Sequence, residues 1–76
     1  MNSNMLISSV HSWVEFQQYD TDTKVTVAIR AISAIAPRDS QSTYVYIDDG
    51  EGTHWVVQGS YQETCDLIAS RYLSGR

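Results

Sequence analysis

The stretch that decides the fold is TYVYIDDGEGTHWVV, residues 43–57. Residues 43–47 alternate between two sets of side chains, as the residues of a half-buried strand do, and residues 53–57 form a second run rich in β-branched and aromatic residues. The segment between them holds three carboxylates and two glycines. Short acidic, glycine-bearing segments between two such runs are typical of hairpin turns. The stretch therefore predicts two antiparallel strands joined by an acidic turn.

Three more strands are expected before this hairpin, because the same alternation recurs between groups of turn-forming residues. Alternation breaks between Ala28 and Ala31, which indicates a tight turn or bulge before the third strand, and Pro37 should close that strand because proline cannot donate to a ladder. The expected strands cover residues 12–19, 24–29 and 32–36, and the expected turns cover residues 20–23 and 38–41.

A single helix is expected at the end of the chain. Ser60 and Glu63 have the S-x-x-E spacing of a capping box, in which each side chain accepts a hydrogen bond from the other residue's backbone amide. The residues after Ser60 show helical periodicity, and Gly75 is a plausible stop. The apolar stripe of this helix is expected to consist of Tyr61, Thr64, Cys65, Ile68, Ala69 and Tyr72.

Together these elements predict an α+β fold, an antiparallel sheet of about five short strands with one C-terminal amphipathic helix packed on one face. Residues 1–10 are expected to form a flexible N-terminal arm, and residues 11–76 a single small β-rich domain. A chain of 76 residues buries a small core, and its one cysteine excludes an intramolecular disulfide. Self-association into a homo-oligomer is therefore expected.

Charge and hydropathy narrow the classes of function. Five Lys and Arg residues against nine Asp and Glu residues give a formal net charge of −4, which opposes direct binding to a nucleic-acid backbone. The chain has no apolar run long enough to span a bilayer, and its start lacks the features of a signal peptide. A cytoplasmic protein without a membrane partner is expected.

Two groups of residues could carry chemistry, and each has a simpler interpretation. Asp48, Asp49 and Glu51 could hold a divalent cation, but they lack the spacing of a calcium loop and fit a solvated turn better. Cys65 could be a nucleophile with His54 or His11 as its base, but it lies in the apolar stripe of the helix. Common catalytic signatures are absent, so we expect no enzyme, no catalytic or metal residues and no cofactor.

Aromatic residues are the main candidates for binding. If Val45 faces the helix, Tyr44 and Tyr46 face away from it, and the register decides whether His54 and Val56 or Trp55 and Val57 join them. The expected interface is an aromatic surface, and the alternative is that the tyrosines simply lie on a solvated face. Candidate binding residues are Trp13, Tyr44, Tyr46 and Trp55, with Arg30 and Arg38 as possible phosphate ligands if they lie near an aromatic ring.

Three segments, VTVAIRAISAIAP (25–37), TYVYIDDG (43–50) and VVQGSYQETCDLI (56–68), resemble small FlbD-like proteins and many uncharacterised phage and prophage products. The shared pattern is a strand, an I-x-x-I segment, a T-x-V strand, a D-G turn and a V-x-x-S-x-x-E entry to the last helix. The chain departs from it at Gly59, where a charged residue is usual, and in its longer turn. The resemblance implies a non-enzymatic accessory protein that binds something and often self-associates.

The expected function is a small phage- or prophage-encoded binding protein, present in the host cytoplasm. It would act as a homo-oligomer that modulates a protein partner, such as a component of host defence. The alternative is a sponge that sequesters a small nucleotide between subunits. A transcriptional regulator of the flagellar kind is disfavoured by the negative charge.

Overall fold

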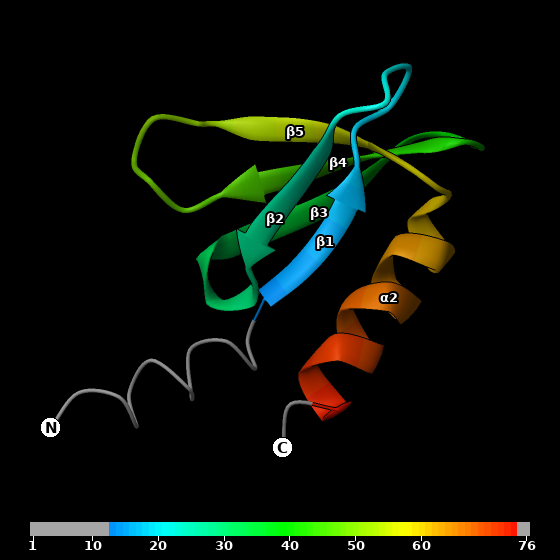
Figure 1. Cartoon of the computed structure of the whole chain (residues 1–76). Coiled ribbons are helices and arrows are strands. Elements are labelled where there is room, and N and C mark those ends of the chain that lie inside the picture. Colours follow the sequence, from blue (N-terminus) through cyan, green and yellow to red (C-terminus); the bar gives the residue numbers. More distant parts are fainter. Residues whose placement is uncertain (1–12, 75–76) are drawn as a thin grey trace, which may run out of the picture.

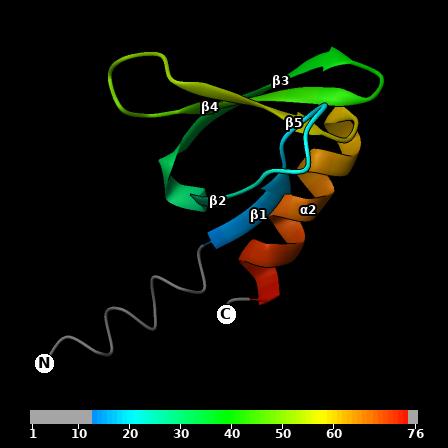
Figure 2. The same cartoon turned by 45° about the horizontal axis from the view of Figure 1, so that its top comes forward.

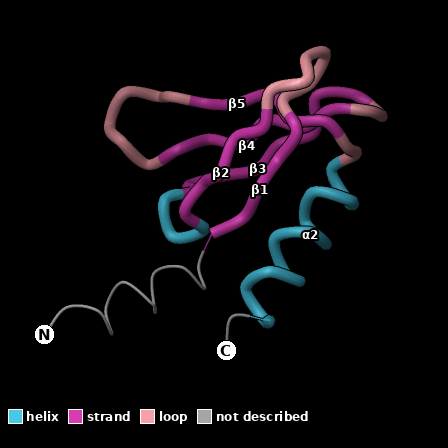
Figure 3. The backbone as a smooth tube through the Cα atoms, in the orientation of Figure 1, coloured by secondary structure: helices cyan, strands magenta, loops and turns pink. Residues whose placement is uncertain are grey.

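The computed structural model describes residues 13–74, which form five strands, a short 3₁₀-helix and one α-helix (Figure 1, Figure 3). In chain order they are β1 (Trp13–Gln17), β2 (Lys24–Ala28), η1 (Ile29–Ala31), β3 (Ile32–Asp39), β4 (Ser42–Ile47), β5 (His54–Gln58) and α2 (Tyr61–Ser74). All strand pairs are antiparallel, so the α+β class, the five strands and the C-terminal helix are confirmed. The arm expected over residues 1–10 and the stop expected at Gly75 lie outside the described residues.

The strands are divided between two sheets. β1 pairs only with β2 as a hairpin, and β3, β4 and β5 form a meander with β4 in the centre. η1 separates β2 from β3 at the point where the alternation breaks in the sequence, so these two strands do not pair. The sheets meet where Gln18 bridges to Val57 and the Tyr19 amide donates to the Val56 carbonyl at 2.8 Å. Figure 2 shows the resulting two layers, with α2 beside the hairpin.

β3 extends further than the sequence predicts. Pro37 does not close the strand, which continues to Asp39 with irregular pairing between Pro37 and Asp39. Proline is tolerated here because β3 is an edge strand, whose outward positions need no amide donor. The turn that follows is tightened by Asp39, whose carboxylate accepts hydrogen bonds of 2.8 Å from the Gln41 amide and the Ser42 hydroxyl. These hydrogen bonds also lower the pKa of Asp39, the Gln41 amide having the larger effect.

The core lies between the two sheets and α2. It consists of side chains that are at most 6% exposed, namely Val14, Phe16, Val27, Val45 and Val57. Trp55 and Ile47 of the meander and Leu67 and Ile68 of α2 pack against this cluster. Thr43, also fully buried, donates its hydroxyl to the Gly59 carbonyl at 2.9 Å and so ties β4 to the segment that enters the helix.

The capping box at the start of α2 is confirmed. The Ser60 amide donates to Glu63 Oε1 at 2.8 Å, and the Glu63 amide donates to Ser60 Oγ at 3.1 Å. Gly59, at φ 118°, makes the turn that leads from β5 into this cap. No helix among residues 13–74 has the length and apolar character needed to cross a membrane.

The stripe that α2 buries is narrower than the sequence predicts. Thr64 is buried, and Leu67 and Ile68 pack against the core, whereas Tyr61 and Tyr72 are 43% and 57% exposed. Ala69 is also exposed. The expected stripe was therefore wrong at Tyr61, Ala69 and Tyr72, and it missed Leu67. The helix contacts the core through Thr64, Leu67 and Ile68, which are spaced i, i+3 and i+4.

Candidate binding face

The register of β4 and β5 decides which side chains share the outer face of the meander. Tyr44 pairs with Val56 and Tyr46 pairs with His54, while Val45 pairs with Trp55 on the inner face. Because side chains alternate across a strand, the two tyrosines lie on the face opposite the core. Of the two registers open from the sequence, the structure has the one that places His54 and Val56 beside the tyrosines.

Three aromatic rings touch one another on this outer face. The ring centroids of Tyr44 and Tyr46 are 5.9 Å apart, and the His54 ring lies 5.6 Å from Tyr44 and 5.3 Å from Tyr46. The Tyr44–His54 pair is edge-to-face, with an interplanar angle of 80°. These distances and angles lie in the range of favourable aromatic contacts. Each ring is therefore in contact with the other two.

Small residues surround the rings. The cross-strand neighbours of Tyr44 and Tyr46 on β3 are Ala36 and Ala34, whose methyl groups can cover little of a tyrosine ring. No described element lies over this side of the meander, since the hairpin and α2 are both on the other side (Figure 2). We refer to the whole set as the tyrosine–histidine face, which comprises Ala34, Ala36, Tyr44, Tyr46, His54 and Val56.

The acidic turn begins directly beyond this face. Asp49 organises it, because its carboxylate accepts a hydrogen bond from the Glu51 amide at 2.9 Å and another from the Thr53 hydroxyl. These hydrogen bonds, that from Thr53 foremost, lower the pKa of Asp49 and keep it ionised. Asp48 and Glu51 are exposed, and their carboxylates accept no hydrogen bond from the described residues. The interpretation as a hairpin turn is confirmed, and residues 13–74 contain no group of three or more potential metal ligands.

Two of the aromatic residues expected at the interface lie elsewhere. Trp55 points to the inner face and packs against the core, so it cannot join Tyr44 and Tyr46. Trp13 begins β1 in the other sheet, where it is 43% exposed. The expected surface of four aromatic residues is thus reduced to the two tyrosines. His54, which the sequence placed there only under one register, is the third ring.

Arg30 is not part of the tyrosine–histidine face, whereas Arg38 lies at its border, because it donates to Ser42, which shares a side of β4 with Tyr44 and Tyr46. Arg38 lies over the ring of Tyr19, with its guanidinium carbon 5.4 Å from the ring centroid. It also donates to Asp39 at 3.2 Å and to Ser42 at 3.1 Å. Arg30 is exposed on η1 and forms no ion pair with the described residues. Arg38 therefore lies near Tyr19, as a phosphate site with a stacked base would require. One nitrogen of its guanidinium, Nη1, already donates to the Asp39 carboxylate.

Cys65 is not positioned for catalysis with His54. It lies partly buried on α2, on the core side of the meander, whereas His54 lies on the outer face. Its described neighbour is Tyr61, whose pKa is raised by a hydrogen bond to Cys65. His11, the other base considered, lies outside the described residues.

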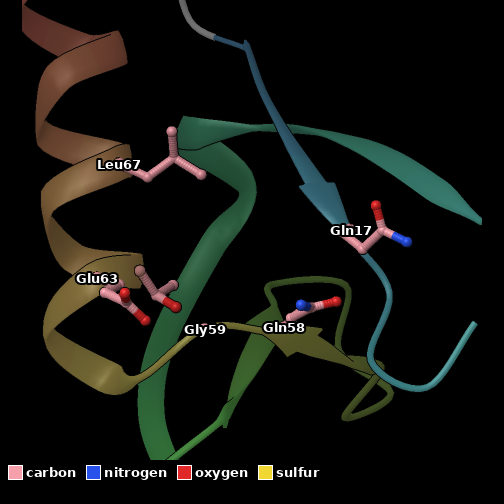
Figure 4. A pocket seen from close by; sticks show the side chains of 6 residues that line it. Gln17, Gln58, Gly59, Glu63 and Leu67 are labelled. Atoms are coloured by element: carbon pink, nitrogen blue, oxygen red, sulfur yellow. The ribbon is translucent and has the colours of Figure 1, made fainter. Parts of the chain in front are cut away.

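A shallow groove lies beside the start of α2 (Figure 4). It has a volume of about 400 Å³ and is lined by Gln17, Gln58, Gly59, Glu63, Thr64 and Leu67. The groove could not be foreseen from the sequence, because these residues come from separate elements. Glu63 is engaged in the capping box, and no buried side-chain N or O atom among the described residues lacks a partner.

A scan against protein-family models and searches of curated proteins and of solved structures found no match to this chain. The resemblance to FlbD-like proteins, and the phage origin that it suggests, stay predictions.

Proposed function

We propose that the protein is a non-enzymatic binding module that docks a protein partner on the tyrosine–histidine face. The observation that carries the proposal is the cluster of three touching rings on a sheet face that no described element covers. Uncovered apolar surface of this kind is typical of interfaces, where tyrosine is enriched. The net charge of −4 disfavours a nucleic acid as the partner.

Tyrosine suits this role for a further reason. It has few rotatable bonds, so it loses little conformational entropy on binding, and contacts with neighbouring rings restrict it further. The hydroxyl groups of Tyr44 and Tyr46 form no hydrogen bond with the described residues, so both can serve a partner. The tyrosine–histidine face thus offers a partner both apolar ring surface and hydroxyl groups that can form hydrogen bonds.

Self-association is the second part of the proposal. Among the described residues the core contains five buried apolar side chains, and Trp13, Tyr72 and Leu73 remain between 43% and 58% exposed. Association that covers such residues would supplement the core. Size-exclusion chromatography with light scattering should show an oligomer for the wild type and a lower mass for Leu73→Ser. A monomer at all concentrations would refute this part alone.

Display of a random peptide library tests the docking face without assuming a partner. Peptides selected on the wild type are rescreened on Tyr44→Thr/Tyr46→Thr, which removes both rings and keeps β-branched residues suited to a strand. The matched control is Trp13→Thr, which removes an exposed aromatic residue from the other sheet. Circular dichroism and urea unfolding establish that each variant is folded.

The expected result is a set of peptides that bind the wild type and Trp13→Thr but not the double tyrosine variant. If a folded double variant keeps all selected peptides, the tyrosine–histidine face is not the docking surface. The proposal would also be refuted if the selected peptides lost binding equally to Tyr44→Thr/Tyr46→Thr and to Trp13→Thr, because such peptides would recognise exposed aromatic residues in general.

The nucleotide sponge is the alternative, and the pairing of Arg38 with Tyr19 favours it. An arginine over an aromatic ring can bind a phosphate while the ring stacks on a base. Arg38 would first have to release Asp39, which competes for the same guanidinium. A thermal shift with millimolar nucleotide that Arg38→Gln abolishes would support the sponge, and no shift would exclude it.

A further inference from the structure

We propose that the partner segment docked on the tyrosine–histidine face is a cationic, extended stretch of protein, whose alternate arginines stack on Tyr44 and Tyr46 and pair with the carboxylates of the acidic turn. This inference rests on the proposed function and names the chemistry of the partner. Three features carry it, namely the charge around the face, the position of the carboxylates and the spacing of the rings.

The surroundings of the tyrosine–histidine face are negatively charged. Between Ser42 and Gln58 there are three carboxylates and no Lys or Arg. Arg30 precedes Ala31, whose carbonyl accepts a hydrogen bond from the Asp48 amide at 2.7 Å. It forms no ion pair with the turn. Arg38, which donates to Ser42 on the same side of β4 as the tyrosines, is paired with Asp39. The three carboxylates of the turn therefore leave a field that attracts a cationic segment and repels an acidic one.

The carboxylates lie next to the rings. Tyr46 and His54 are the last outward-facing pair before the turn, so the turn begins at the edge of the ring cluster. Asp49 is used internally by Thr53 and Glu51, whereas the side chains of Asp48 and Glu51 are exposed. A guanidinium over Tyr46 would therefore lie beside the start of the turn, where the carboxylates of Asp48 and Glu51 are exposed. Arginine fits better than lysine, because its planar group stacks on a ring and pairs with a carboxylate in a bidentate manner.

The ring spacing fits an extended peptide. The centroids of Tyr44 and Tyr46 are 5.9 Å apart. In an extended chain the residues that share a face recur every ~6.6 Å, twice the rise of about 3.3 Å per residue. Arginines at i and i+2 can thus lie over the two rings at once.

The test uses a labelled peptide of four Gly-Arg repeats, titrated with the full chain and followed by fluorescence anisotropy. The first control is the same peptide with citrulline, a neutral analogue of arginine of nearly the same shape. The protein variant is Asp48→Asn/Glu51→Gln, which removes two exposed charges and leaves Asp49 in place. The matched variant is Asp20→Asn/Asp22→Asn, which removes two charges from the exposed turn between β1 and β2.

We expect the citrulline peptide to bind at least about tenfold more weakly than the arginine peptide, because it lacks the charge for stacking and pairing. Asp48→Asn/Glu51→Gln should weaken arginine-peptide binding about fivefold or more, and Asp20→Asn/Asp22→Asn less than about twofold, because attraction at a distance is screened by salt. Equal affinity for both peptides, or equal losses in the two protein variants, would overturn the inference. Failure to bind the arginine peptide at millimolar concentration would overturn it as well.

The library experiment separates this inference from the proposed function. Selected peptides that depend on the tyrosines and are enriched in alternating arginines support both. Selected peptides that depend on the tyrosines but are neutral or acidic leave the docking face intact and refute the cationic partner.

Discussion

Val56 and Val57 are neighbours on β5 that the register places on opposite faces, so they form a matched pair for testing the structure. Val57 is fully buried in the core, whereas Val56 is partly exposed on the tyrosine–histidine face. Val57→Ala removes two carbon atoms at about 0.8 kcal/mol each and leaves a cavity, which together should lower the free energy of unfolding by about 2–3 kcal/mol. Val56→Ala opens no cavity, so its loss should stay below about 1 kcal/mol.

Urea unfolding followed by tryptophan fluorescence measures both losses, because Trp55 packs against the core and changes environment on unfolding. A chain of this length has a total stability of about 4–11 kcal/mol, so Val57→Ala remains folded in water. Both variants replace valine with alanine on β5, so the difference in intrinsic strand propensity between the two residue types cancels when the two losses of stability are compared. Equal losses, or a larger loss for Val56→Ala, would mean that β5 is shifted by one residue and that the assigned faces are exchanged.

Three further predictions concern the ends of the strands and the start of the helix. Ser60→Ala should lower the free energy of unfolding by about 1 kcal/mol, because one orphan amide of α2 loses its acceptor; unchanged stability in urea would contradict the cap. Gly59→Ala has room for its methyl group, with the nearest atoms at 3.7 Å, but its φ of 118° should cost about 1–3 kcal/mol in chemical unfolding. The depressed pKa of Asp39 stabilises the fold above the ordinary value of 3.8, and this contribution is lost as the pH falls through the lower folded-state value. Asp39→Asn should therefore be less stable than the wild type at neutral pH, with a difference that shrinks in acid; a constant difference would be evidence against the hydrogen bonds from Gln41 and Ser42.

Local features of the fold were predictable from the sequence because they depend on neighbouring residues. The hairpin around the acidic turn followed from alternation and glycines, and the capping box from the spacing of Ser60 and Glu63. The break between β2 and β3 was also foreseen. Its consequence, two sheets in place of one, was not, because strand alternation says nothing about which strands pair.

The make-up of the candidate face depended on register, which alternation alone leaves open. A shift of one residue exchanges His54 with Trp55, so the sequence could not decide which of them joins the tyrosines. The structure decides through the pairing of Tyr46 with His54, which buries Trp55 beside Val45. The groove beside α2 could not be predicted from the sequence for a different reason: its lining residues come from separate elements that are brought together only in the folded structure.

The fold does not depend on the residue types of the outer face, so the presence of tyrosine at positions 44 and 46 bears on function. The core depends on Val45 and Val57, and the turn on Asp49 and its glycines, so neither requires tyrosine at position 44 or 46. Cross-strand aromatic contacts add some stability, but only about 0.2–1 kcal/mol per pair. A solvated face would be served by threonine or lysine, which expose less apolar surface than an aromatic ring. If Tyr46→Thr lowers the free energy of unfolding by no more than this amount while it abolishes peptide binding, the ring is present for a partner; a loss of several kcal/mol would instead assign it to the fold.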